Sequence, residues 1–144
     1  MSRVRARIEI DAPPEAVFDY FDDLANARVL IPMLVDIEKV EPLPNGGRHV
    51  EYTTRSESGI VPESSEHLEY ERPRRTVTRG IRSNIETIAT REFLPTPHGT
   101  LVVATVAIQV PVKYVGSLVS APLRGPLRRS LRGSLRAVKD AIER

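Results

Sequence analysis

The segment from residue 34 to residue 110 constrains the fold most, because it consists of strand-like runs joined by short turns. Turn-forming residues such as those at 45–47 and 95–99 separate runs of β-favouring residues. Parallel strands need crossover connections of about a dozen residues or more, which these short turns do not provide. The pattern predicts six consecutive antiparallel strands, at residues 34–41, 48–56, 60–71, 75–81, 85–94 and 100–110.

The residues before this segment predict one strand and two helices. Apolar and charged residues alternate over residues 3–11, which indicates a strand with one face in solvent. Pro13 and Pro14 suit the first turn of a helix that continues to about residue 22. A second short helix, with Asp22 or Asp23 as its cap, covers residues 24–30.

Residues 112–144 predict a long amphipathic helix. Apolar residues recur there at helical spacing: Val115, Val119, Leu123, Leu127, Leu131, Leu135, Val138 and Ile142. Pro122 and Pro126 interrupt the first third, so we expect a kinked start and a regular helix from about Pro126. We therefore predict that residues 1–144 form one α+β domain, a curved seven-stranded antiparallel sheet wrapped around the C-terminal helix.

Composition excludes several classes of site. The chain of 144 residues has no cysteine, which excludes disulfides, thiol nucleophiles and thiolate metal sites. The three histidines, His49, His67 and His98, lack the spacing of metal ligands. No apolar run is long enough to span a bilayer, and the first residues lack the apolar region of a secretory signal. We expect a cytoplasmic protein without a metal or a cofactor.

The charges are distributed unevenly. Residues 1–72 hold 15 acidic and 8 basic side chains, whereas residues 73–144 hold 4 acidic and 13 basic ones. In the final helix, four arginines recur at every fourth position: Arg124, Arg128, Arg132 and Arg136. They form either a contact surface for an anionic membrane or, in the reading we favour, a solvated outer face. Nucleic acid is not an expected partner, because aromatic residues are 5% of the chain and none lies among these arginines.

Four stretches of the chain carry a resemblance to a known family. They are residues 10–19 (Ile-Asp-Ala-Pro-Pro-Glu-Ala-Val-Phe-Asp), residues 69–75 (Glu-Tyr-Glu-Arg-Pro-Arg-Arg), residues 94–100 with Leu-Pro and His-Gly-Thr, and residues 134–143 of the last helix. In this order they resemble the START-like (SRPBCC) helix-grip superfamily, in its polyketide cyclase/dehydratase-like branch. The resemblance covers essentially the whole chain. It implies a hydrophobic cavity between the sheet and the long helix, and it does not imply one chemistry.

Strand alternation predicts which side chains face that cavity. Apolar neighbours on the same face place seven residues inward: Tyr52, Ser64, Glu66, Thr87, Arg91, Val106 and Ile108. A buried guanidinium is costly unless it is paired, so Arg91 should meet Glu66, Tyr52 or an anionic ligand. Tyr52 and Glu66 are also the candidate catalytic acid or base. His49 and His67 have the opposite parity, which predicts that both face outward.

Three functions fit these residues. The first, which we favour, is a binding protein for a small hydrophobic or amphipathic molecule such as a lipid, a polyketide or a quinone-like compound. The second is a cyclase or dehydratase that uses the same cavity. The third is a lipid or quinone chaperone, similar to the coenzyme Q-binding branch, that meets an anionic membrane through its arginines. Leu101 and Val103 lie on the outer parity of their strand, where they either pack under the N-terminal helices or form a weak self-association surface. We expect a monomer or a weak homodimer.

Overall fold

The computed structural model describes residues 2–109 and 117–144, with the side chains of the last helix described from residue 125 onward. The strands are β1 (Ser2–Ile10), β2 (Leu34–Pro42), β3 (Arg48–Ser56), β4 (Gly59–Glu71), β5 (Arg75–Arg82), β6 (Ile85–Thr96) and β7 (Gly99–Gln109). The helices are α1 (Pro14–Asp22), the 3-10 helix η1 (Leu24–Asn26), α2 (Ala27–Leu30) and α3 (Ser117–Glu143). No helix in the described part of the chain is long and apolar enough to cross a bilayer.

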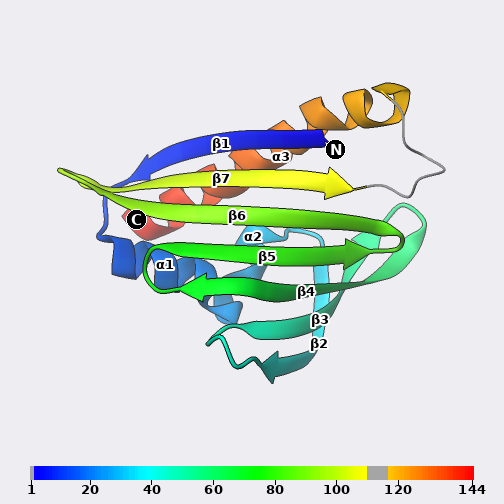
Figure 1. Cartoon of the computed structure of the whole chain (residues 1–144), viewed down its shortest axis with the longest axis horizontal. Helices are drawn as coiled ribbons and strands as arrows, with labels where there is room; N and C mark the ends of the chain where they lie inside the picture. Colours follow the sequence, from blue (N-terminus) through cyan, green and yellow to red (C-terminus); the bar gives the residue numbers. More distant parts are fainter. Residues whose placement is uncertain (1, 110–116) are drawn as a thin grey trace.

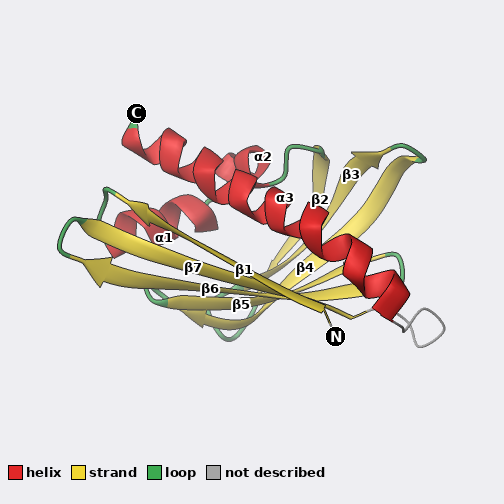
Figure 2. Cartoon of the chain, turned by 90° about the horizontal axis from the view of Figure 1, so that it is seen from above, coloured by secondary structure: helices red, strands yellow, loops and turns green. Residues whose placement is uncertain are grey.

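The strands form one antiparallel sheet of seven strands in the order β1-β7-β6-β5-β4-β3-β2. The strands from β2 to β7 are neighbours in chain order, and β1 joins the free edge of β7. Helix α3 lies across one face of this curved sheet, which we call the inner face, and the opposite face is the outer face (Figures 1 and 2). The predicted α+β helix-grip architecture is confirmed.

Helix α3 differs from the expectation in its first third. It is helical without interruption from Ser117 through Pro122 and Pro126, so the helix begins before Pro126 and not at it. A proline removes one hydrogen bond from the ladder and leaves the bonds of the other residues in place. Residues 112–116 of the predicted element, and the side chains of Val119 and Leu123, lie outside the described residues.

The hydrophobic core lies between the inner face, α1 and the C-terminal half of α3. Its members share nearly complete burial: Ala6, Ile10, Val17, Phe18, Phe21, Phe93, Val102, Ala104, Leu135 and Val138. Phe93 of β6 meets Phe18 and Phe21 of α1 edge to face, with ring centroids 5.2 and 5.5 Å apart. Leu135 and Val138 confirm the apolar stripe of α3. This core occupies one end of the inner face and leaves the other end to the site described below.

Polar contacts fix both helices on the sheet. Lys139 of α3 donates to the carbonyl of Glu9 at 2.8 Å, and Glu143 accepts from the backbone N–H of Asp11 at 2.9 Å. Arg72, in the turn after β4, binds both carboxylate oxygens of Asp19 on α1 at 2.8 and 2.7 Å. Bidentate pairs of this kind fix orientation as well as distance, so α1 and α3 have defined positions over the inner face.

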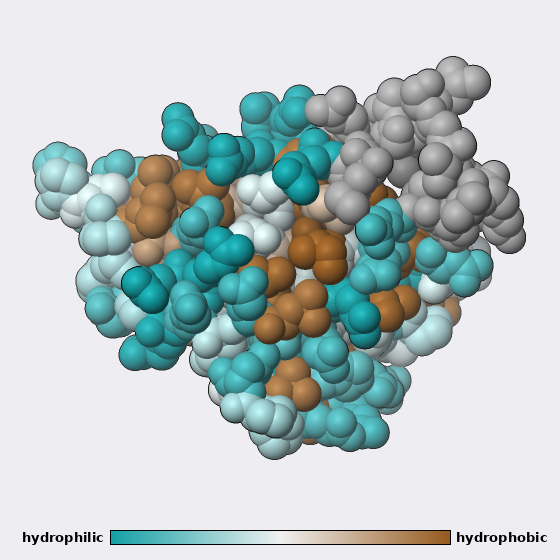
Figure 3. Space-filling model, in the orientation of Figure 1, coloured by the Kyte–Doolittle hydropathy of each residue, from teal (hydrophilic) through white to brown (hydrophobic). Residues whose placement is uncertain are grey.

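The outer face carries no helix in the described part of the chain. Small apolar patches are separated there by hydrophilic side chains (Figure 3). Val103 is buried on this face by its neighbours within the sheet, and Leu101 is half-buried. Weak self-association through these residues stays a prediction.

Candidate functional site

A cavity of about 280 Å³ lies between the inner face, α1, α2 and α3. Its wall on the helix side is mainly apolar: Phe21, Leu24, Ala27, Leu30, Ile31 and Leu131, with the polar Asp23 and Ser134. Its floor comes from strands β3 to β6: Arg48, Val50, Tyr52, Ser65, His67, Thr78, Gly80, Thr87, Ala89 and Arg91. The volume is near the lower end of the range of about 300–1,000 Å³ that small-molecule sites occupy.

The two sides of the cavity differ in chemistry because helices and strands present different faces. An amphipathic helix turns one apolar face to the interior, which gives the apolar wall. The strands extend beyond the core, and there their inner positions carry polar as well as apolar residues. On β6 the inner positions follow the order Phe93, Arg91, Ala89 and Thr87, from the core to the cavity. The arrangement suits a molecule with one apolar and one polar side.

Five of the seven predicted cavity residues lie on the inner face, where alternation placed them, and three of the five line the cavity. Tyr52, Thr87 and Arg91 line the cavity floor. Val106 and Ile108 lie on the inner face of β7, opposite Ala89 and Thr87 of β6, but they are not among the residues that line the cavity. What these residues do for a ligand stays a proposal.

The placement of Ser64 and Glu66 on the inner face was wrong. Both lie on the outer face, whereas Ser65 and His67 line the cavity. The cause is an irregularity between His67 and Glu69, where the register shifts and Leu68 becomes the extra residue of β4. Tyr70 beyond this bulge therefore does not share a face with Glu66, and the prediction that His67 faces outward was wrong as well.

On the outer face, Glu66 takes part in a row of charges that crosses several strands. His49 Nδ1 lies 3.4 Å from Glu66 Oε1, and Arg79 reaches Glu66 and Glu86 at 4.0 Å each. A parallel row joins Arg75 to Glu69 and Glu92 at 3.6 and 3.7 Å. Cross-strand pairs of opposite charge stabilise a sheet, so these contacts give Glu66 a role in the sheet rather than in the cavity.

Tyr52 is held as a neutral phenol. Its hydroxyl donates to Glu63 Oε1 at 3.3 Å, and Glu63 also accepts from the hydroxyl of Thr54. Arg82 lies 3.5 Å from the same carboxylate. Burial, followed by the nearby charge of Glu63, raises the pKa of the Tyr52 hydroxyl far above its usual value. Tyr52 can donate a hydrogen bond but cannot serve as a base near neutral pH.

His67 owes its position to a close approach of the preceding hairpin. A Cβ on Gly47 would lie 2.4 Å from the Cβ of His67, so only glycine fits there. Asn45 donates to the His67 carbonyl at 2.9 Å, and the backbone N–H of Arg48 donates to His67 Nδ1 at 3.0 Å. Burial, followed by the charge of Arg48, lowers the pKa of the imidazole. His67 is therefore neutral, with its proton on Nε2.

Arg91 and Arg48 bring positive charge to the same end of the cavity. Arg48 lies 3.3 Å from Asp22 Oδ1, and Asp22 Oδ2 accepts from the hydroxyl of Tyr70 at 2.7 Å. Arg91 stacks over Phe21, with its Cζ 4.9 Å from the ring centroid, and forms no salt bridge or hydrogen bond within the described residues. Burial lowers the pKa of the Arg91 guanidinium to about 10, so it is still charged at neutral pH.

The signals for Tyr52, Thr87 and Arg91 were present in the sequence because their strands alternate regularly. His67, Arg48 and Ser65 were missed. Residues 63–67 of β4 contain no apolar residue, so nothing there marks the buried face. Glycines at 46 and 47 indicate a tight turn, but the sequence does not show that this turn packs against His67.

The predicted arginine row lies on α3. Arg132 and Arg136 are exposed and Arg128 is half-buried, while the side chain of Arg124 lies outside the described residues. Leu131 and Leu135 of the adjacent row face the sheet side. This is the arrangement expected when the arginine side of α3 faces solvent, and contact with a membrane stays a prediction.

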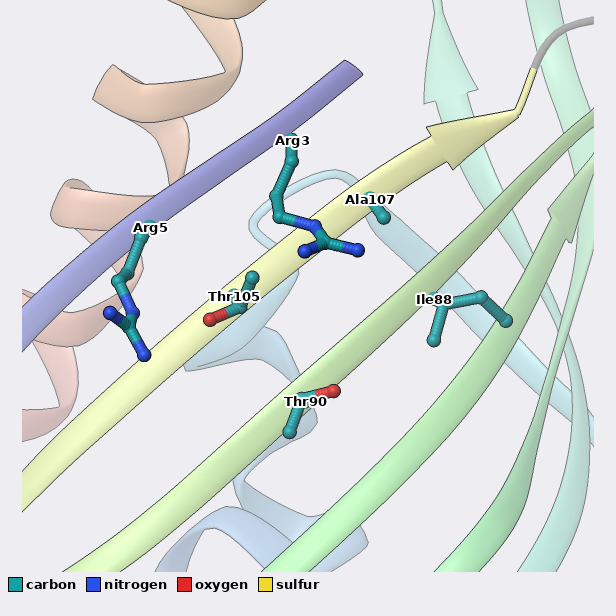
Figure 4. Close-up of a pocket in the computed structure, with 6 residues that line it drawn as sticks. All are labelled: Arg3, Arg5, Ile88, Thr90, Thr105 and Ala107. Carbon is teal, nitrogen blue, oxygen red and sulfur yellow. The ribbon is translucent and has the colours of Figure 1, made fainter. Parts of the chain in front are cut away.

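A second hollow, of about 380 Å³, lies on the outer face over β1, β7 and β6. Arg3 and Arg5 of β1 extend across Thr105 and Ala107 of β7, and two residues of β6 complete it (Figure 4). None of the predicted cavity residues belongs to this hollow. Among residues 2–109 and 117–144, no three His, Asp or Glu side chains gather closely enough to hold a metal ion.

The chain is similar in structure to several solved proteins. A START superfamily protein from Mycobacterium smegmatis superposes with a TM-score of 0.76 at 12% identity, covering 99% of each chain. The di-domain ARO/CYC BexL of the BE-7585A biosynthetic pathway gives a TM-score of 0.77 at 19% identity, over 96% of this chain and 48% of that one. A protein from Deinococcus radiodurans gives 0.68 at 21% identity, over 96% of this chain and 95% of that one. These likenesses show a shared fold.

Sequence comparison gives the family. None of the curated proteins is similar enough in sequence to match. The family model described as "Polyketide cyclase / dehydrase and lipid transport" matches residues 1–143, which is nearly the whole chain. The chain therefore belongs to the polyketide cyclase/dehydrase and lipid transport family.

Proposed function

We propose that the protein binds a small amphipathic molecule in the cavity between its sheet and α3. The observation that carries this proposal is the division of the cavity into an apolar helix side and a polar sheet side. Apolar lining supplies affinity, and a few placed polar groups fix orientation, as in most small-molecule sites. The family description, which includes lipid transport, supports the same class of ligand.

The volume favours a small ligand. At about 280 Å³ the cavity suits a molecule of one or two rings better than a lipid with two long chains. The mixed floor also disfavours a purely hydrocarbon ligand, because Tyr52, His67 and Arg91 would lose their contacts with water without gaining hydrogen bonds.

Fluorescence of the neutral dye N-phenyl-1-naphthylamine, which rises in apolar surroundings, tests the proposal. Two variants on the same strand form a matched pair. Ala89→Leu puts a larger side chain on the cavity floor, and Thr90→Leu puts the same side chain on the outer face. We expect wild type and Thr90→Leu to bind the dye alike and Ala89→Leu to bind it at least about tenfold more weakly. Absence of binding, or equal binding by both variants, would contradict the proposal.

A second candidate function is a cyclase that binds and activates a polyketone in the same cavity. It is favoured by His67, a neutral imidazole on the cavity floor, and by the likeness to the ARO/CYC protein BexL. Ring closure of a polyketone begins when a base from solvent removes a proton next to a carbonyl, and the Nε2–H of His67 can stabilise the enolate oxygen that forms. In this version His67 replaces Glu66, which lies on the other face of the sheet.

Exchange of the α-protons of an acetoacetyl thioester in D₂O, followed by proton NMR, separates the two functions. An enzyme of this type accelerates the exchange, and His67→Leu, which removes the Nε2–H donor, removes the acceleration while the circular dichroism spectrum stays that of wild type. A protein that only binds leaves the exchange rate at its uncatalysed value. That result would eliminate the second candidate and leave the first in place.

A further inference from the structure

The charge inside the cavity is unbalanced, and this imbalance identifies the class of ligand more closely. Glu63 pairs with Arg82 at 3.5 Å, behind the Tyr52 hydroxyl. Asp22 pairs with Arg48 at 3.3 Å. Arg91 has no carboxylate within salt-bridge distance among the described residues. One positive charge therefore remains on the cavity floor without a partner.

The acidic groups nearest to Arg91 do not cancel this charge. Asp22 and Arg91 line the same small void of about 10 Å³, and no salt bridge joins them in the described part of the chain. The carboxylate of Asp22 is already shared between Arg48 and the Tyr70 hydroxyl. Asp23, on the cavity wall, is exposed, and its Oδ1 accepts from the N–H of Ala25 at 2.9 Å as the cap of η1. Neither carboxylate forms a salt bridge with Arg91 in the described part of the chain.

The strands beside Arg91 supply no carboxylate either. Its register partners are Thr76 on β5 and Ala104 on β7, both of which are uncharged. Phe21 covers one side of the guanidinium. The remaining direction is the cavity, which Arg91 lines. A half-buried guanidinium that faces the cavity in this way gains most from an anion with two oxygens, because its paired N–H groups match a carboxylate.

His67 adds a second donor at the same place. Its Nδ1 accepts from the backbone of Arg48, so the proton is on Nε2, and no described residue accepts a hydrogen bond from Nε2. His67 and Arg91 line both the cavity and the small void beside it. The polar end of the cavity thus offers two sets of donors and an uncompensated positive charge.

We propose that the ligand is a monoanionic organic acid, whose carboxylate binds Arg91 and the Nε2–H of His67 while its apolar body packs against Phe21, Leu30 and Leu131. This proposal rests on the proposed binding function and names the class of ligand. It disfavours neutral ligands such as quinones, which would leave the charge of Arg91 buried without a partner.

The test compares 2-naphthoate with 2-naphthamide, two molecules of nearly equal shape that differ in charge. Affinities for both are measured at pH 7.5 by displacement of N-phenyl-1-naphthylamine. We expect wild type to bind the carboxylate at least about tenfold more tightly than the amide, as for a charge-assisted hydrogen bond. In Arg91→Met the ratio falls to threefold or less, while the affinity for the amide changes little. Arg3→Met, on the outer face, keeps the wild-type ratio.

Asp22→Asn gives a result of opposite sign. It removes the negative charge nearest to Arg91 and keeps an oxygen that can accept from Tyr70. We expect it to bind 2-naphthoate at least about threefold more tightly than wild type, with little change for 2-naphthamide.

The outcomes separate this inference from the proposed function. Equal affinities for acid and amide in wild type would overturn the inference and leave the binding function standing. A preference for the acid that survives in Arg91→Met would also overturn it, because another cation would then hold the carboxylate. If wild type binds neither these molecules nor the dye, the proposed function itself fails.

Discussion

Replacing Arg91 by methionine should make the ligand-free protein more stable, although it removes a charged residue from the candidate site. The side chain lies on the cavity floor, and it has no ionic partner among the described residues. Methionine has a similar length, and its thioether fits irregular apolar space against Phe21. The substitution therefore removes the cost of keeping a charge out of water and leaves no large hole.

The size of the effect follows from the protonation of the guanidinium. Burial lowers the pKa of Arg91 from the usual value of an arginine to about 10. Because one pKa unit corresponds to about 1.4 kcal/mol, holding the charge in the cavity costs about 3 kcal/mol. The stacking of Arg91 on Phe21 offsets about 1 kcal/mol of this cost and is lost in the variant. The expected net gain in the free energy of unfolding is about 2 kcal/mol.

The gain should be constant over the neutral pH range. Since the folded pKa lies below the unfolded one, the unfolded chain binds more protons only between about pH 10 and about pH 12.5. Stability of the wild type rises with pH within that interval, and the cost of the buried charge is fully present at every lower pH. The difference between wild type and Arg91→Met therefore stays the same from about pH 6 to about pH 9.

Thermal unfolding followed by circular dichroism measures the difference. For a chain of 144 residues, a gain of about 2 kcal/mol raises Tm by about 6 °C. Arg3→Met is the control, because Arg3 is exposed on the outer face and its loss should change stability by less than about 0.5 kcal/mol. A lower Tm for Arg91→Met than for wild type would refute the reasoning, since it would show that Arg91 gains more from its surroundings than it loses.

Three further predictions concern the residues around the cavity. The pKa of His67 in the folded protein lies below 6.5, so on acidification the unfolded state takes up the proton first. The free energy of unfolding therefore falls as the pH drops below 6.5, and His67→Gln should reduce this fall in urea titrations. Gly47→Ala, whose Cβ would meet that of His67, should cost about 1–3 kcal/mol, and a loss under about 0.5 kcal/mol would contradict the close approach. Glu66→Gln should keep dye affinity within about twofold and cost less than about 1 kcal/mol; a tenfold loss of affinity would contradict its outer-face position.

The architecture could be predicted because two sequence patterns are clear. Short turns between strand-like runs allow only antiparallel neighbours, and a long amphipathic helix needs one apolar surface to cover. Tyr52 and Arg91 were placed correctly for a related reason. Each lies on a strand that alternates regularly and contains a well-buried apolar residue, Val50 on β3 and Phe93 on β6. The buried residue marks the inner face, and every second residue along the strand shares that face.

On strand β4, alternation predicts the wrong face for the residues around Glu66. Its apolar residues Ile60 and Leu68 are 56% and 44% exposed, so they do not mark the buried face. Tyr70 does mark it, but the bulge at Leu68 lies between Tyr70 and the cavity and reverses the parity. A bulge is set by contacts between strands, here including the packing of the 45–47 turn on His67, which alternation within one strand does not report.

The same bulge determines the chemistry of the site. With a regular β4, the cavity floor would contain the carboxylate of Glu66, which could neutralise Arg91 directly. With the bulge, Glu66 pairs with His49 and Arg79 on the outer face, and the neutral His67 takes the inner position. One extra residue in one strand thus changes the floor from a closed ion pair to a pair of donors with an unpaired charge. The fold provides the cavity, and a local feature of one strand sets the groups that line it.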